Sequence, residues 1–362
     1  MVSQEKIIVA GCRQRVYEPY IVRTVIVTGD HAGTAKTVAR ELGFELREDS
    51  VLLGSQIEAL DDEALQKRLL NVKVIARTTP EQKLRIARLY KSLGQVVAMT
   101  GDGVNDAPAL REANIGVAVG SGTDVAKSSA DLVLLDNNFE TIVSAIEEGR
   151  IVLQNIRKVI VYMLSNSFDE LFLIGGSLLM GLALPLSATQ ILWVNLFADS
   201  FPAVALAFES HKADIGKRPS RTDGHLFDRE MQFLILVVGT ITSVALLAMY
   251  VALLKLGFDP ATVRTFIFAS FGLYTLFLVF SVRSLHASIF SYGLLSNRYL
   301  VGGSLVGVAM MAAAVYVPAL QDLFGTVALS GPWIAGVVAF GTAAIVLREA
   351  SKWLFRRGYM QK

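Results

Sequence analysis

The sequence predicts an α/β domain with a doubly wound parallel sheet, followed by an all-α bundle of six transmembrane helices. The first observation is the charge distribution, because 39 of the 66 Lys, Arg, Asp and Glu residues lie in residues 1–150 of a 362-residue chain. The second is a set of six apolar stretches after residue 158, most of them close to the roughly 20 residues that cross a bilayer. With 53% hydrophobic and 18% charged residues, a single soluble globule and a disordered chain are both excluded.

The composition also narrows the partners. A net charge of +2, with no basic run interleaved with aromatics, predicts no nucleic-acid partner. The single cysteine, Cys12, excludes a disulfide framework and a cysteine-rich zinc site, and it fits a reducing cytosolic face. Residues 1–15 lack the apolar core of a secretory signal, so the internal apolar stretches are expected to direct membrane insertion.

The α/β prediction comes from strand-like runs that alternate with helix-like stretches. Strands are expected at residues 25–30, 72–76, 95–99, 115–119 and 132–135. Helices are expected at residues 34–42, 80–93 and 107–113. A repeated strand–loop–helix order is typical of a doubly wound sheet, whose chemistry lies at the carboxyl ends of its strands.

Acidic residues lie in a glycine-rich loop at the end of the third predicted strand. In the string TGDGVND, Asp102 and Asp106 suit a magnesium ion that keeps some of its waters, and the glycines let the backbone approach a phosphate. Lys83 adds positive charge for a transferring phosphoryl group. The plainer alternatives are that Asp106 caps the following helix and that Asp30 belongs to an ordinary Thr-Gly-Asp turn.

The six predicted spans cover residues 159–182, 189–208, 232–256, 261–282, 300–320 and 333–347. Loops after the first, third and fifth spans are nearly free of basic residues. The loop at 210–229 and the tail are instead basic, with Lys212, Lys217, Arg218, Arg221 and Arg229, and then Lys352, Arg356, Arg357 and Lys362. Because cytoplasmic loops carry such an excess, both termini are expected in the cytoplasm, with the lipid bilayer as a partner.

Polar side chains inside the first two spans predict a cation site. Asn166 lies three and four residues before Asp169 and Glu170, so the three share one helix face. Asn195 and Asp199 share a face in the same way. Such oxygens are ligands for hard cations, although interhelical hydrogen bonding is an alternative role. Because no Lys or Arg is expected at that depth, a bound cation or protons must neutralise the carboxylates.

Several of these strings resemble P-type cation-transporting ATPases. The hinge region of that family is matched by TGDGVNDAPAL at residues 100–110, IGVAVGSGTDVA at 115–126 and ADLVLL at 130–135. TGDH at residues 28–31 and Lys83 match its other phosphorylation motifs. Ser165-Asn166 with Asp169, and LWVNL at 192–196 with Asp199 and Pro202, resemble the type II group of calcium and sodium/potassium pumps.

The resemblance implies a fold and a division of the chain. The fold would be a partial haloacid-dehalogenase-like phosphorylation domain, joined by a stalk to the last six helices of a ten-helix bundle. The implied division is an atypical start (1–24), the partial phosphorylation domain (25–149), the stalk (150–158), the six-helix transport domain (159–355) and a cytoplasmic tail (356–362).

The resemblance also implies roles for single residues. The cofactor-binding loop would be Thr100, Gly101, Asp102 and Gly103, with Asp102 as the magnesium ligand. The groups around the phosphoryl group would be Thr28, Gly29, Asp30, Lys83, Asn105 and Asp106. The ligands of the transported cation would be Asn166, Asp169, Asn195 and Asp199, whereas Glu170 has no clear counterpart.

Departures from the family pattern bear on activity. Asp-Lys-Thr-Gly, which contains the phosphorylated aspartate, and Thr-Gly-Glu do not occur, and the nucleotide-binding domain and the first four helices are not matched. Residues 11–23 do not follow the pattern, which favours a truncated or rearranged start. Ala198, Tyr274 and Thr275 stand where calcium pumps place threonine or carboxylate and amide groups, so one bound ion is expected rather than two.

The resulting hypothesis is the C-terminal part of an ATP-driven cation pump in the cell membrane of a prokaryote. Its cofactor would be magnesium, with ATP as the phosphoryl donor of the complete pump, and the chain alone is expected not to hydrolyse ATP. Calcium is the first expectation for the ion, with sodium, potassium, manganese and protons open. The alternative is a non-catalytic cation-binding membrane protein, or one subunit of a split pump with a separate N-terminal half. A phosphatase is disfavoured because no Asp-x-Asp motif occurs.

Overall fold

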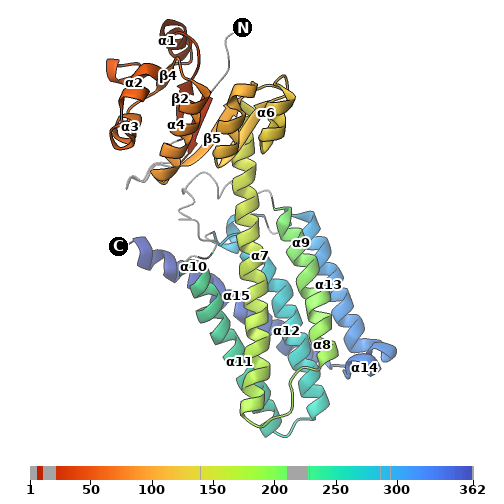
Figure 1. The fold of residues 1–362 in the computed structure, drawn as a ribbon. Coiled ribbons are helices and arrows are strands. Elements are labelled where there is room, and N and C mark those ends of the chain that lie inside the picture. The colour runs from red at the N-terminus through yellow and green to blue at the C-terminus, as the bar shows by residue number, and fades with distance from the viewer. Residues whose placement is uncertain are drawn as a thin grey trace. The chain divides into compact units, whose positions relative to one another are not determined.

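The computed structural model describes residues 6–10, 22–138, 140–209, 227, 229–285, 287–293 and 295–360. Most of the expected atypical start, with Cys12, lies outside these ranges, as do four of the basic loop residues and the end of the tail: Lys212, Lys217, Arg218, Arg221 and Lys362. The chain divides into two compact units, Met1–Glu147 and Glu148–Lys362 (Figure 1). Each unit is described by itself.

The first unit is built on a seven-stranded sheet in the order β3-β4-β2-β1-β5-β6-β7. Its strands are β1 (Lys6–Ala10), β2 (Val22–Val27), β3 (Val51–Leu53), β4 (Val74–Ala76), β5 (Val96–Gly101), β6 (Ile115–Val119) and β7 (Leu132–Leu134). The pairs that do not involve β1 are parallel, which confirms the doubly wound α/β prediction.

The central strand β1 is an addition that the sequence pattern did not predict. It lies between β2 and β5 and is antiparallel to both, with Lys6 opposite Ile26 on one side and Thr100 on the other. An antiparallel ladder satisfies the backbone groups of both neighbours as well as a parallel one does. The sheet of the first unit is therefore mixed at its centre and parallel on both flanks.

Helices connect the strands of the first unit. They are α1 (Ala32–Glu41), α2 (Gly54–Ala59), α3 (Asp62–Leu69), α4 (Pro80–Ser92), α5 (Ala107–Glu112) and α6 (Asp124–Ser129). The longest, α4, begins with a capping box in which the Thr79 hydroxyl accepts the Gln82 amide at 3.3 Å, with Pro80 in its first turn. It ends before Gly94, whose φ of 73° suits glycine.

Among the described residues of the second unit, six helices are long and apolar enough to span a membrane. They are Thr141–Leu179 in α7 (Glu140–Leu179), Ala188–Ala207, Phe233–Lys255, Pro260–Val282 (α12), Arg298–Tyr316 (α13) and Gly331–Trp353 in α15 (Gly331–Met360). In Figure 1 the long helices of this unit run side by side. The six-span prediction is therefore confirmed.

Three spans differ in detail from their predicted form. The expected stalk and first span form one helix, α7, which begins at Glu140. The second span consists of α8 (Ala188–Trp193), a π-helical segment η3 (Val194–Ser200) and α9 (Phe201–Ala207). The fifth ends at Tyr316 rather than Leu320, because Pro318 starts the short helix α14 (Pro318–Phe324).

The third span also has a π-helical beginning. It consists of α10 (Arg229–Gln232), η5 (Phe233–Val238) and α11 (Gly239–Lys255). The fourth span, α12, is the most buried, and α15 packs along it. Its neighbour α13 approaches closely at Gly307, where an added Cβ would lie 2.6 Å from Leu276. The helix α12 is therefore the core of this unit.

Candidate phosphate and cation sites

A buried ion pair lies at the carboxyl edge of the sheet in the first unit. The Lys83 ammonium, on α4, lies 2.8 Å from one carboxylate oxygen of Asp106, and the two side chains are 3% and 1% exposed. The other Asp106 oxygen accepts the Gly103 amide at 3.2 Å. Strand β5 and the turn after it thus hold the carboxylate in a fixed position. Asp106 does occupy the N-cap position of α5, the alternative considered above, but its side chain makes no cap hydrogen bond to that helix.

The end of β2 supplies neutral hydrogen-bonding groups at the same edge. Thr28 is buried, and its hydroxyl accepts the Asp30 amide at 3.1 Å. Its carbonyl accepts both the amide and the hydroxyl of Thr78, which joins this turn to the residues before α4. Gly29 is exposed and Asp30 half-buried, so the turn presents its backbone to solvent.

Close approach around Asp106 depends on a glycine at the end of β5. A Cβ added to Gly101 would lie 2.4 Å from the Asp106 Cβ, a distance that ordinary contacts do not allow. Asp102, the next residue, is half-buried, and its carbonyl accepts the Thr123 amide at 2.9 Å. Asn105 is exposed. The predicted loop therefore holds one buried and one accessible carboxylate.

This arrangement fits a magnesium ion shared with a phosphate rather than a metal caged by protein alone. Within the described ranges, no three His, Cys, Asp or Glu side chains form a group that could hold a metal. Magnesium commonly binds through one or two carboxylates, retained waters and substrate phosphate oxygens. Asp102, half-buried in the same loop as Asp106, is a carboxylate of the kind that such a site uses.

Within the second unit, the first two spans meet through a polar cluster. The Asn166 amide donates to Asp199 at 2.9 Å, and the Thr275 hydroxyl donates to the Asn166 oxygen at 3.5 Å. The Tyr162 hydroxyl donates to the Ala198 carbonyl at 2.6 Å. Asn166 is fully buried and Asp199 is 6% exposed. The predicted pairing of these two spans is present for Asn166 and Asp199.

Glu170 and Asn195 lie at the accessible edge of this cluster. Glu170 interacts electrostatically with both Asn195 and Asp199. Glu170 is half-buried with one carboxylate oxygen lacking a partner among the described residues, whereas Asn195 is exposed. Sequence reasoning left the role of Glu170 open, and the structure places it with Asp199 and Asn195.

Asp169 faces a different set of side chains. It accepts the Ser243 hydroxyl at 2.5 Å, and its second oxygen lacks a partner within the described ranges. It interacts electrostatically with Arg348, a buried residue of α15. The expectation that no Lys or Arg lies near these carboxylates is therefore wrong. Its cause was the predicted end of the sixth span at residue 347, since α15 continues as a helix to Met360.

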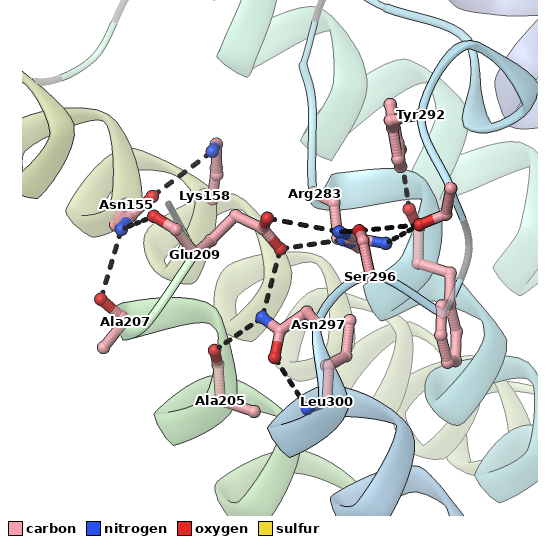
Figure 2. Close-up of polar contacts among 12 residues, drawn as sticks. Asn155, Lys158, Ala205, Ala207, Glu209, Arg283, Tyr292, Ser296, Asn297 and Leu300 are labelled. Atoms are coloured by element: carbon pink, nitrogen blue, oxygen red, sulfur yellow. Dashed lines mark hydrogen bonds and ion pairs between the residues drawn. The ribbon is translucent and has the colours of Figure 1, made fainter. Parts of the chain in front are cut away.

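Sequence reasoning also missed a polar clasp at one end of the bundle, formed by Asn155, Glu209, Arg283, Ser296 and Asn297. Figure 2 shows the Arg283 guanidinium against the Glu209 carboxylate, with N–O distances of 2.7 and 3.2 Å. Arg283 also donates to Ser296 at 2.6 Å, and Asn297 donates to Glu209 at 3.1 Å. The only sequence signal was the charge at the end of each apolar run.

The clasp joins four segments of the second unit. Asn155 on α7 donates to the carbonyls of Ala207 and Glu209 at 3.1 and 2.8 Å, and Lys158 donates to the Asn155 oxygen at 3.2 Å (Figure 2). Asn297 is the N-cap of α13, where it accepts the Leu300 amide. The clasp therefore fixes the end of α9, the end of α12 and the start of α13 to the helix α7.

Comparison with known proteins gives matches along most of the chain. Residues 183–354 match the family model described as cation transporting ATPase, C-terminus, and residues 18–114 match that of haloacid dehalogenase-like hydrolases. The calcium-transporting ATPase of Bacillus subtilis is 40% identical over 328 residues, which is 90% of this chain.

Further relatives show the same pattern. Calcium-transporting ATPase 1 of Yarrowia lipolytica is 38% identical over 92% of this chain, and that of Lactococcus lactis is 36% identical over 90%. The chain spans only 36–37% of the length of these relatives. The matched segments combine a haloacid-dehalogenase-like region with a six-span membrane region, in the order observed here. The chain belongs to the P-type cation-transporting ATPase family and corresponds to its C-terminal portion.

Proposed function

We propose that this chain supplies the phosphoryl-binding edge and the ion-binding helices of an ATP-driven calcium pump. The observation that carries the proposal is the pair of acidic residues Asp199 and Glu170, which lie on adjacent spans with no cationic side chain bonded to either within the described ranges. Carboxylates at that depth are costly without a compensating charge, and an oxygen-only ligand set suits calcium. The calcium pumps among the relatives support this ion.

In the first unit, the proposed role is to bind and orient a phosphoryl group. Lys83 and the backbone at Thr28, Gly29 and Asp30 would stabilise its negative charge, and Asn105 would contact it from the exposed side of the loop. Magnesium would be held by Asp102, with Asp106 and the loop Thr100–Gly103 supporting it. Bound magnesium would screen the charge of the phosphate oxygens of ATP or of the phosphorylated protein.

The proposed domain division keeps residues 25–149 as the phosphorylation domain and 159–355 as the transport domain, joined through 150–158 within α7. Both termini are proposed to lie on the cytoplasmic side of a prokaryotic cell membrane, because the basic loop and tail residues favour that orientation. Proposed partners are calcium, the bilayer and a separate N-terminal part of the pump.

Two measurements test this function. The full chain in lipid nanodiscs is expected to bind calcium in a calorimetric titration, and Asp199→Asn is expected to lower the affinity by at least about tenfold, since a charged ligand is lost. Ser200→Ala, on an exposed side chain of the same segment, is the matched control. Equal affinity of Asp199→Asn and wild type would contradict the proposed site.

The second measurement concerns the chemistry. With labelled ATP and magnesium, the chain alone is expected to form no acid-stable phosphoenzyme, because its sequence contains no Asp-Lys-Thr-Gly. A labelled band at the size of this chain would show that another residue accepts the phosphoryl group. It would contradict the proposal that the chain needs a partner to turn over ATP.

A further inference from the structure

The backbone of the second span cannot complete a regular α-helix at Ala198. In an α-helix the carbonyl of residue 198 accepts the amide of residue 202, but Pro202 has no N–H to donate. Ala198 also lies in the π-helical segment η3, whose wider turns depart from the α-helical hydrogen-bond pattern. Because Ala198 is fully buried, its carbonyl requires a donor other than the backbone of residue 202.

Tyr162 of α7 supplies such a donor. Its hydroxyl donates to the Ala198 carbonyl at 2.6 Å, and both residues are fully buried. The same hydroxyl lies 3.4 Å from the carbonyl oxygen of Thr275 on α12. Since a tyrosine hydroxyl has one hydrogen to donate, the shorter contact is the stronger hydrogen bond. Tyr162 therefore connects α7 to the carbonyl that Pro202 leaves without its α-helical donor.

A second contact, one turn further along α7, holds the next residue of the same segment. Asn166 follows Tyr162 by four residues, so the two side chains lie on one face of α7. The Asn166 amide donates to the carboxylate of Asp199 at 2.9 Å, and Asp199 directly follows Ala198. Tyr162 thus holds the backbone just before Asp199, whereas Asn166 holds its carboxylate.

The fourth span contacts both of these side chains. The Thr275 hydroxyl donates to the Asn166 oxygen at 3.5 Å, and the Thr275 carbonyl lies 3.4 Å from the Tyr162 hydroxyl. Thr275 is fully buried in α12, the most buried span. Contacts from two other helices therefore fix the position of Asp199. A ligand that is fixed before the cation arrives binds it more tightly, because less ordering is required on binding.

We propose that Tyr162 is a positioning residue of the transmembrane cation site. Its hydroxyl replaces the backbone donor that Pro202 lacks, and it thereby fixes Ala198 and the following Asp199 against α7. Tyr162 acts through the backbone of η3 and does not touch the ion. This inference rests on the proposed function, in which Asp199 binds the transported cation.

Removal of the hydroxyl alone tests this role, in calorimetric titrations of the full chain in lipid nanodiscs with calcium chloride. Tyr162→Phe keeps the ring and is expected to lower the calcium affinity by about fivefold. One buried hydrogen bond typically changes an equilibrium constant by between about twofold and about tenfold. Size-exclusion elution and thermal unfolding measure the folding and the stability of each variant.

The matched control is Tyr250→Phe, which removes another tyrosine hydroxyl from the same unit. Tyr250 is 1% exposed, and its hydroxyl donates to the Ala183 carbonyl at 2.9 Å. Both variants lose one hydrogen bond between a tyrosine and a carbonyl, so a similar loss of thermal stability is expected. Only Tyr162→Phe is expected to lower the calcium affinity, which separates positioning from a general loss of stability.

A second variant restores the donor that the backbone lacks. In Pro202→Ala, the amide of residue 202 can donate to the Ala198 carbonyl. This variant alone is expected to bind calcium within about threefold of wild type. Adding Tyr162→Phe to Pro202→Ala is then expected to lower the affinity by less than about twofold, compared with about fivefold in the wild-type background. The difference measures the coupling between the hydroxyl and the proline.

Two outcomes overturn the inference alone. If wild type binds calcium and Tyr162→Phe binds it equally well, the hydroxyl does not position the site. If Tyr162→Phe causes an equal loss in both backgrounds, the hydroxyl does not act through the Ala198 carbonyl. If Tyr162→Phe does not fold, recovery of folding and calcium binding with Pro202→Ala supports the inference, and no recovery contradicts it. Absence of calcium binding in wild type and in Tyr250→Phe would overturn the proposed function, and the inference with it.

Discussion

Arg283 and Arg348 are both buried in the membrane unit, but the surroundings of their charged guanidinium groups differ. Arg283 is bonded to a carboxylate by two N–O contacts and to Gly293 and Ser296 by further hydrogen bonds. Arg348 is equally buried, but its nitrogens lack hydrogen-bond partners among the described residues. The first arrangement is typical of a fixed structural joint. The second holds its guanidinium by burial among side chains that include Tyr274, without an ion pair among the described residues, and is therefore less firmly fixed.

The largest effect on stability is expected from replacing Arg283, whose guanidinium nitrogens are all hydrogen-bonded. Arg283→Met leaves the Glu209 carboxylate buried without its partner, which typically destabilises a protein by about 3–5 kcal/mol. Unfolding of the full chain in detergent, followed by circular dichroism during a denaturant titration, measures the loss. Arg298→Met, on an exposed side chain near the clasp, is the control and is expected to change stability by about 0.5 kcal/mol or less.

A second substitution sharpens this result. Adding Glu209→Leu to Arg283→Met removes both charges and is expected to recover much of the lost stability, because well-packed apolar residues often replace buried ion pairs without loss. Asn297 keeps its bond to the Ala205 carbonyl in that variant. If stability does not recover in the double variant, the uncompensated Glu209 charge is not the cause of the loss.

The same comparison extends to the first unit. Lys83→Met leaves the Asp106 carboxylate buried without its cation, although it still accepts the Gly103 amide at 3.2 Å, and a loss of about 3 kcal/mol is expected. The control is Lys91→Met, because its ion pair with Glu112 is partly exposed and is worth about 0.2–1 kcal/mol. Thermal unfolding of the two variants compares them. Similar losses would contradict the distinction between buried and exposed pairs.

A smaller effect tests the close approach at Asp106. Gly101→Ala places a Cβ against the Asp106 side chain, and overpacking of this kind costs about 1–3 kcal/mol. Gly149→Ala is the matched control, since nothing lies within 4 Å of its added Cβ on helix α7 and alanine favours helix. The expected signs are therefore opposite in thermal unfolding. A stabilising Gly101→Ala would refute the packing argument.

The smallest effect concerns a buried group that is neutral. Burial raises the pKa of Tyr90 to about 12, and its hydroxyl donates to the Leu69 carbonyl at 3.1 Å. Because the folded pKa exceeds the unfolded value of 10, its contribution to stability is complete below pH 10 and is lost as pH rises toward 12. Tyr90→Phe is expected to cost about 1 kcal/mol at neutral pH and to flatten this alkaline dependence.

The test of Tyr90 compares unfolding of wild type and variant at about pH 8 and at about pH 11, on either side of the unfolded tyrosine pKa of about 10. Tyr292→Phe is unsuitable as a control because burial also raises its pKa. Tyr299, which is exposed, provides the control through Tyr299→Phe. A parallel loss with pH in wild type and Tyr90→Phe would assign the alkaline dependence to other groups.

The sequence predicted the elements well where one periodic signal dominates. The apolar runs located six spans, and TGDGVND located the strand end that holds Asp106. The partners of single polar groups were less accessible. Asn166 and Asp199 meet across the first two spans, which were expected to present polar groups to each other, but Asp169 is bonded to Ser243 of the third span. The packing of all six spans decides which neighbouring helix a given helix face contacts. The spacing of residues within one helix does not carry that information.

Charges at the ends of spans were also hard to interpret from sequence. Arg348 follows an apolar run and reads as the start of a basic tail, yet α15 continues as a helix and buries it. The same holds for Glu209 and Arg283 after their own runs. Membrane boundaries estimated from hydropathy place such residues at the surface, and only the ends of the helices in three dimensions correct this.

The unbroken helix α7 has a mechanical consequence. Within the second unit, Asn155 of the clasp and Asn166 of the polar cluster lie on this helix 11 residues apart, which is about 17 Å along its axis. Because both asparagines lie on one continuous helix of the second unit, a rotation of that helix about its axis would reorient them together. A single rotation would then change the hydrogen-bond geometry of the clasp and the geometry around Asp199 together.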